Sequence, residues 1–109
     1  MSRLNIATLV KRVKESPNDS FSKFALALEL IKIDKRKQAM ILFEDIVEHD
    51  SNYVGVYYHL GEQYLLDGEN KKAFDTYNKG IDIASSLNDE HAKSELLTAL
   101  LTLESEMEG

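Results

Sequence analysis

The stretch from residue 57 to residue 77, YYHLGEQYLLDGENKKAFDTY, decides the fold. On both sides of Asp67-Gly68 its apolar residues recur three or four positions apart, which is the period of an amphipathic helix. Glycine readily adopts the left-handed conformation that closes a helix, so Gly68 is expected to end the first helix. Asn70 is expected to cap the second helix. The stretch therefore predicts a helical hairpin.

The same pattern occurs a second time, 34 residues earlier in the chain. A shift by 34 residues superimposes apolar, aromatic or small residues, the pairs being Leu26 and Leu60, Ala27 and Gly61, Leu30 and Tyr64, Ala39 and Ala73, Phe43 and Tyr77, and Val47 and Ile81. The small residues allow two helices to cross closely, and the bulky residues fill the space beside the crossing. An internal repeat of this period predicts stacked helical hairpins.

The beginning of the chain continues this pattern as an incomplete unit. Residues 1–17 align with the second half of a unit, because Leu9 lies 34 residues before Phe43. Pro17 is expected to stop this opening helix, and Ser20 is expected to cap the helix that follows.

The last helix differs from the repeats, because the Leu-Gly pattern does not recur in it. Asn88 or Asp89 is expected to cap it. One side is apolar and comprises Ala92, Leu96, Ala99, Leu100, Leu103 and Met107. The residues facing away are Ser94, Thr98, Thr102 and Ser105. This distribution suits a cap that covers the last unit of a stack and is polar outside. Leu97 and Leu101 extend the apolar side and are candidates for a dimer contact.

We therefore predict one all-α domain over residues 1–109, because this length suits a single domain. Its parts are an opening half-unit helix at 1–17, repeat one at 20–53, repeat two at 54–87 and a cap helix at 89–107.

These units resemble the tetratricopeptide repeat family, whose pattern runs aromatic, Leu-Gly, Tyr, Ala, Phe and Pro. The second unit follows this pattern with Tyr57, Leu60-Gly61, Tyr64, Ala73 and Tyr77. The first unit has Leu26-Ala27, Leu30, Ala39 and Phe43. It departs from the family at Lys23, which stands at the aromatic position, while Pro17 occupies the closing-proline site. The resemblance covers roughly residues 4–88 and implies a right-handed solenoid of helical hairpins.

Composition excludes several kinds of chemistry. The chain has no Cys, which rules out disulfides, thiolate zinc sites, iron–sulfur clusters and Cys nucleophiles. No signal peptide and no apolar run of roughly 18 residues is present, so we expect a soluble, cytoplasmic protein and no membrane contact. The net charge of -6 makes nucleic acid an unexpected partner. Residues 1–16 are basic and residues 89–109 acidic, so the basic start could meet the acidic end of another molecule.

Catalytic patterns are weak. The histidines, His49, His59 and His91, lack the spacing of a helical zinc motif. Ser20 and Lys23 formally match Ser-x-x-Lys, but the companion motifs of acyl enzymes are missing. Adjacent acids such as Glu44 and Asp45 point in different directions on a helix, and no phosphate-binding glycine loop occurs. We expect no enzyme activity, no cofactor and no metal.

The family resemblance implies that the first helix of each unit lines a concave groove for a partner's peptide segment. The candidate groove residues are Phe21, Phe24, Leu28, Ile31, Tyr58, His59, Glu62 and Leu65. Family members that grip a terminal carboxylate use Lys and Asn on this face, whereas this chain has Phe24 and Leu28. A carboxylate clamp is therefore not expected.

Three interpretations of this apolar stripe remain open: it receives a partner's apolar segment, it is buried internally, or it forms a homodimer seam. We predict the first, a non-catalytic adaptor or scaffold module that binds a protein or peptide segment. The alternative is a self-associating structural module in which the groove and the cap helix form a homodimer interface.

Overall fold

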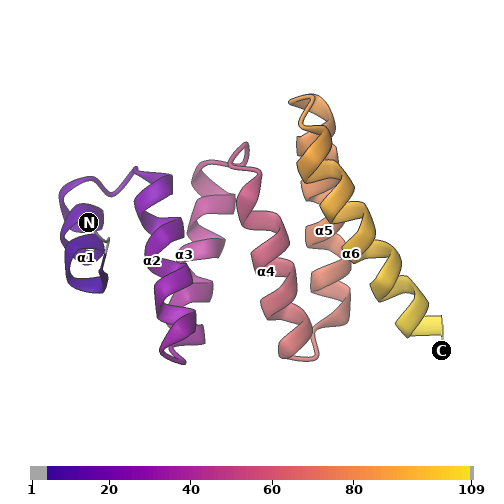
Figure 1. Cartoon of the computed structure of the whole chain (residues 1–109), viewed down its shortest axis with the longest axis horizontal. Helices are drawn as coiled ribbons and strands as arrows, with labels where there is room; N and C mark the ends of the chain where they lie inside the picture. Colours follow the sequence, from indigo (N-terminus) through magenta and orange to yellow (C-terminus); the bar gives the residue numbers. More distant parts are fainter. Residues whose placement is uncertain (1–4, 109) are drawn as a thin grey trace. The chain divides into compact units, whose positions relative to one another are not determined.

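The computed structural model describes residues 5–108, which form six α-helices and no strand (Figure 1). The helices are α1 (Ile6–Glu15), α2 (Ser20–Lys32), α3 (Arg36–His49), α4 (Gly55–Leu66), α5 (Asn70–Ser86) and α6 (Glu90–Glu108). Residues 1–4 of the expected opening half-unit lie outside the described residues.

The helices group into two compact units, one up to Tyr53 and one from Val54. The first unit contains α1, α2 and α3, and the second contains α4, α5 and α6. The single domain with the repeat boundaries given above stays a prediction.

In the first unit, α2 packs against both α1 and α3. Its buried apolar residues are Leu9, Leu26, Ala27, Ala39, Phe43 and Ile46. Ala27 and Ala39 are completely buried, as expected for small residues where two helices of a hairpin approach each other. Four repeat-defining positions therefore lie in the core of this unit, Leu26, Ala27, Ala39 and Phe43, whereas Leu30 and Val47 are half-buried.

Hydrogen bonds at the helix starts of the first unit correct one expectation. The Asp19 side chain, and not that of Ser20, caps α2 by accepting a hydrogen bond from the Ser22 backbone N–H at 3.2 Å. Ser20 is instead the first residue of α2, and its hydroxyl donates to Asp50 Oδ2 at 2.6 Å. The cap thus lies one residue earlier than predicted, and Ser20 ties the start of α2 to the end of α3.

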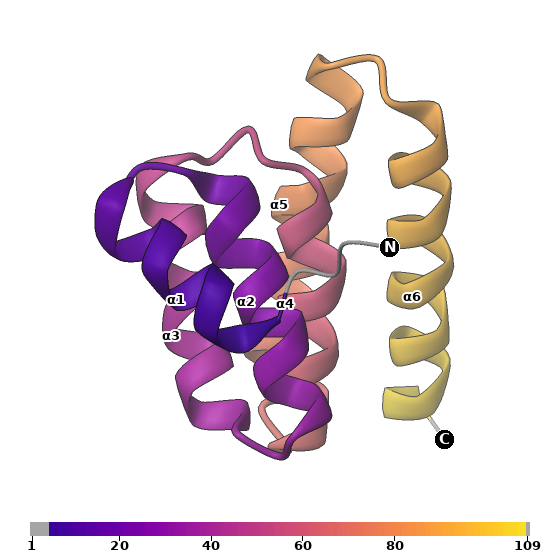
Figure 2. The same ribbon diagram turned by 60° about the vertical axis from the view of Figure 1, so that its left-hand side comes forward.

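In the second unit, α5 packs against α4 and α6, and α4 also contacts α6. Figure 2 shows α5 and α6 lying side by side. Two glycines permit the close approach of the helices. A Cβ on Gly61 would lie 2.7 Å from Tyr77 Cζ, and a Cβ on Gly80 would lie 2.6 Å from Tyr57 Cβ. Gly61 was expected to have this packing role, whereas Gly80 was not singled out by the sequence.

The hairpin turns share one backbone motif. Residues 34, 68 and 88 have φ values of 62°, 74° and 58°, in the left-handed region. The backbone N–H of Gly68 donates to Leu65 O at 3.0 Å, and that of Glu69 donates to Tyr64 O at 2.8 Å. The corresponding bonds after α2 run from Asp34 N to Ile31 O at 3.0 Å and from Lys35 N to Leu30 O at 2.8 Å. Gly68 therefore ends α4 as predicted.

The helix that follows Gly68 does not begin as expected. Asn70 is the first residue of α5, and the residue before it, Glu69, makes no side-chain capping bond. The cap expected at Asn70 is therefore wrong. At the start of α6, the Ala92 backbone N–H donates to Asp89 Oδ1 at 3.0 Å, which selects Asp89 over Asn88 as the capping side chain.

The apolar side of α6 is buried at Leu96, Leu100 and Leu103, as the sequence predicts. Met107 departs from that prediction, because 56% of it is exposed in the last turn of the helix. Leu97 and Leu101 are 38% and 63% exposed. These two leucines therefore lie outside the core of the second unit.

Candidate functional site

The predicted groove residues of the first unit lie on α2 and differ in their surroundings. The Phe24 ring contacts those of Phe43 and Tyr53, with centroid distances of 5.9 and 5.4 Å. Phe24 thus contributes to an aromatic cluster inside the unit. Leu28 and Ile31 are half-buried, whereas Phe21 is 53% exposed. Among these four residues, Phe21 offers the most accessible side chain.

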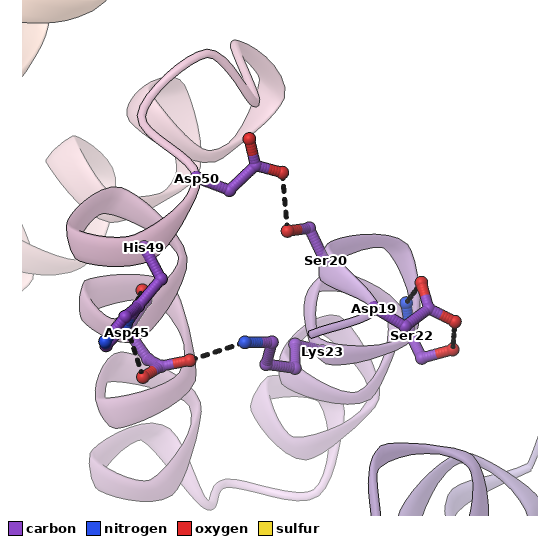
Figure 3. Close-up of polar contacts among 7 residues, drawn as sticks. All are labelled: Asp19, Ser20, Ser22, Lys23, Asp45, His49 and Asp50. Atoms are coloured by element: carbon purple, nitrogen blue, oxygen red, sulfur yellow. Dashed lines mark hydrogen bonds and ion pairs between the residues drawn. The ribbon is translucent and has the colours of Figure 1, made fainter. Parts of the chain in front are cut away.

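Lys23 occupies the position where the repeat pattern has an aromatic residue, and it is only 6% exposed. Its ammonium group donates to Asp45 Oδ2 at 2.6 Å (Figure 3). This hydrogen bond is the main reason that the pKa of Asp45 lies below its ordinary value of 3.8, while partial burial acts in the opposite direction. His49 Nδ1 lies 3.1 Å from Asp45 Oδ1.

The Ser-x-x-Lys match at Ser20 and Lys23 does not form a nucleophile and base. Figure 3 shows that the two side chains turn to different partners, Ser20 to Asp50 directly after α3 and Lys23 to Asp45 on α3. A catalytic pair requires the base within hydrogen-bond reach of the nucleophile. These residues therefore connect α2 to α3.

Three of the four predicted groove residues of the second unit border a cleft of about 250 Å³ between α4 and α6. We call it the α4–α6 cleft. It is lined by Tyr58, Glu62, Leu65, Tyr77, Glu95, Thr98, Ala99, Thr102, Leu103 and Glu106. Three predicted residues, Tyr58, Glu62 and Leu65, are thus brought together. His59 does not line the cleft, and its Nδ1 lies 3.9 Å from Glu62 Oε1.

The α4–α6 cleft is acidic. Glu62 is the main cause of the raised pKa of Tyr58, with burial and Glu95 adding to it. Burial is the main cause for Tyr77, whose pKa is raised to about 12, and Glu62 contributes. Both phenols therefore stay protonated at neutral pH. His91 Nε2 lies 3.5 Å from Glu95 Oε1 outside the cleft lining.

The cleft residues on α6 were missed by the sequence reasoning. Thr98 and Thr102 were assigned to a polar outer surface, yet they line the cleft together with Glu95 and Glu106. The available signal was their spacing, because positions 95, 98, 102 and 106 recur every three or four residues and share one helix face. The cap helix therefore supplies one wall of the candidate site.

Among residues 5–108, no group of three or more His, Asp or Glu side chains is arranged to hold a metal ion. None of the helices in this range is long and apolar enough to cross a membrane.

Two solved structures of a tetratricopeptide repeat domain protein from Salinibacter ruber are similar to this chain. The crystal structure is 43% identical, with the match covering 79% of this chain and 97% of that chain at a TM-score of 0.77. The solution NMR structure is 42% identical, covering 83% and 91% at a TM-score of 0.79. No family model and no curated protein matches the sequence.

A third structure shares the fold at low sequence identity. The TPR2B domain of yeast Sti1, solved as a complex with pHsp70, is 17% identical, with coverage of 93% of this chain and 81% of that chain and a TM-score of 0.84. At this identity the likeness shows the fold alone.

Six helices arranged as sequential hairpins define an all-α helical-repeat protein. With relatives 42–43% identical over about four fifths of its length, the chain belongs to the tetratricopeptide repeat domain proteins. The predicted family and fold class are thereby confirmed. Such domains are generally protein–protein interaction modules and are typically non-catalytic.

Proposed function

We propose that this protein is a non-catalytic adaptor that binds a segment of a partner protein in the α4–α6 cleft. The observation that carries the proposal is the cleft itself, which contains three of the residues predicted to bind a partner. Its volume of about 250 Å³ is below the roughly 300–1,000 Å³ of pockets for drug-sized ligands. A cleft of this size suits side chains of a partner better than a whole cofactor.

Tyr58 and Leu65 are the proposed apolar contacts, since both are half-buried at the cleft and lie two helical turns apart on α4. Aromatic anchors of this kind dominate the affinity of many interfaces. The yeast Sti1 domain, complexed with pHsp70, supports a protein partner by analogy of fold. His59 and the α2 residues Phe21, Phe24, Leu28 and Ile31 stay predicted contacts, and a cytoplasmic location stays proposed as well.

Two neighbouring leucines on α4 provide the test. Leu65 lines the cleft, whereas Leu66 is exposed and does not. Wild type, Leu65→Ala and Leu66→Ala would each be immobilised and used to capture proteins from a lysate of the source organism. We expect a captured partner that is lost with Leu65→Ala and retained with Leu66→Ala, both variants keeping wild-type helicity by circular dichroism. Equal capture by all three proteins would contradict the proposal.

A second candidate function is self-association through α6. Leu97 and Leu101 lie one helical turn apart, and both are exposed on the helix surface. Two copies that pack these leucines against each other would form an isologous dimer.

A further inference from the structure

We propose that the α4–α6 cleft selects partner segments that place Lys or Arg side chains on both sides of an apolar residue. This inference rests on the proposed function and names the chemistry of its partner.

The first argument is the uncompensated charge of the cleft. Three carboxylates line it, from Glu62, Glu95 and Glu106, and none of the lining residues between 5 and 108 is Lys or Arg. The basic groups nearest to two of these carboxylates are His59, 3.9 Å from Glu62, and His91, 3.5 Å from Glu95. Both distances exceed those of a strong charge-assisted hydrogen bond. A partner's cation would therefore find acceptors that the chain itself leaves available.

The second argument is the arrangement of charge around an apolar centre. Glu62 lies one helical turn after Tyr58 on α4, and Glu95 and Tyr58 together line a hollow that adjoins the cleft, so both carboxylates lie on the Tyr58 side of the cleft. Glu106 lies 11 residues after Glu95 on α6, which is roughly 16 Å along a helix. Leu65, Ala99 and Leu103 supply the apolar lining of the cleft. The two acidic ends thus flank an apolar centre.

This spacing specifies the partner segment. An extended chain rises about 3.3 Å per residue and its side chains alternate between two faces. Two cations that reach both acidic ends from the same face therefore lie four or six positions apart, roughly 13 or 20 Å. Apolar side chains between them would contact the apolar lining. An acidic segment would be repelled at both ends, and the negative charge of the whole chain would slow its approach further.

The probe is a pair of synthetic pentapeptides that differ only in charge, acetyl-Arg-Ala-Leu-Ala-Arg-amide and acetyl-Glu-Ala-Leu-Ala-Glu-amide, in which both end side chains and the leucine share one face of an extended chain. Each would be titrated into the ¹⁵N-labelled protein of residues 1–109 and followed by NMR. We expect the Arg peptide to shift the amide signals of Tyr58, Glu62, Thr98 and Thr102, and the Glu peptide to leave them unchanged. Light scattering would show whether the oligomeric state of the protein changes during the titration.

Variants that remove single carboxylates test whether the Arg peptide binds at the cleft. Glu62→Gln and Glu95→Gln are each expected to weaken binding of the Arg peptide about two- to fivefold, the range for partly exposed ion pairs. Glu104→Gln is the matched control, because it removes an exposed carboxylate from α6 that does not line the cleft. It is expected to leave the affinity unchanged.

Three results would overturn the inference. The first is binding of the Glu peptide as tight as that of the Arg peptide, and the second is an equal loss of affinity with Glu104→Gln. The third is self-association that Lys11→Glu abolishes, which would assign the cleft to the basic α1 of a second copy. In each case the proposed function would still hold if Leu65→Ala abolished the capture of a partner protein from the lysate. Capture independent of Leu65 would remove that function itself.

Discussion

The most unusual side chain of the first unit is Lys23, a buried lysine at a position that the repeat pattern gives to an aromatic residue. Its long aliphatic stem occupies interior space, and its ammonium group reaches Asp45 on α3. Where the repeat pattern has an aromatic side chain that packs in the hairpin, Lys23 thus forms an ion pair that joins the two helices.

We predict that Asp45→Asn lowers the free energy of unfolding by about 1 kcal/mol at pH 7. The substitution leaves a buried ammonium without its countercharge, but Asp45 is 38% exposed, so solvent screens part of the interaction. Urea denaturation followed by circular dichroism measures the change. Glu48→Gln, an exposed charge removal on the same helix, is the control and is expected to change stability by less than about 0.5 kcal/mol.

The same pair predicts the direction of a pH effect. Because the pKa of Asp45 is lower in the folded protein than its ordinary value of 3.8, its ion pair contributes fully above that value. The contribution is lost as the pH falls through the folded pKa. The stability difference between wild type and Asp45→Asn should therefore shrink on acidification below 3.8. A difference that stays constant from pH 7 to pH 2 would refute the ion pair as its cause.

The left-handed helix end was predicted from sequence at Gly68, but not at Asp34 or Asn88, which have the same backbone conformation. Gly68 was identified because a left-handed helix end strongly favours glycine. The caps expected at Ser20 and Asn70 were wrong. Asp19, directly before Ser20, is the capping residue of α2, and Glu69, directly before Asn70, stands at the cap position of α5 without a side-chain capping bond. Choosing between such neighbours requires the hydrogen-bond geometry, which sequence spacing does not contain.

At the scale of the helices, Gly80 on α5 connects all three elements of the second unit. A Cβ at this position would lie 2.6 Å from Tyr57 Cβ on α4 and 2.9 Å from Leu96 Cδ1 on α6. We predict that Gly80→Ala destabilises the protein by about 2 kcal/mol, because the overpacking outweighs the gain of roughly 1 kcal/mol in helix propensity.

Thermal unfolding followed by circular dichroism would measure this change. Lys79→Ala is the matched control, because it alters the exposed neighbouring residue on the same helix. If Gly80→Ala were as stable as Lys79→Ala, the close approach of the three helices would be refuted.

The sequence predicted which side of α6 is buried, but it did not predict that the polar side of α6 lines a cleft with α4. Periodicity within one helix separates Leu96, Leu100 and Leu103 from the polar residues around them. It does not reveal that Thr98 and Thr102 line a cleft with α4, because that depends on how α6 packs against another element. The repeat pattern therefore could not predict the α6 side of the candidate site.

At the scale of the whole molecule, the oligomeric state separates the two proposed functions. If α6 mediates self-association, the double variant Leu97→Ser, Leu101→Ser should convert a dimer into a monomer. Removing exposed leucines should leave the fold intact, since neither belongs to the core. Light scattering over a range of protein concentrations makes the measurement. A monomer at every concentration for the wild-type protein would contradict the dimer proposal.

The helical-hairpin architecture was predictable from the sequence because each repeat has one small packing residue in each of its two helices. Small residues at positions 27, 39, 61 and 73 are all buried, so the 34-residue shift identified true packing positions. The site was less predictable. Phe24, expected in the groove, contacts Phe43 and Tyr53 within its own unit, and such aromatic clusters form through turns that periodicity does not describe.

The shared geometry of the hairpin turns makes them interchangeable. Because the turns at Asp34 and Gly68 close with the same pair of backbone hydrogen bonds, their shape depends on main-chain atoms and not on the side chains. Residues 67–70 should therefore graft onto positions 33–36 without loss of fold. Asp34→Gly alone is expected to raise the free energy of unfolding by about 0.5 kcal/mol, by relieving a left-handed residue that carries a Cβ. The turns are thus positions at which hairpins of this kind could be lengthened, shortened or recombined in a designed protein.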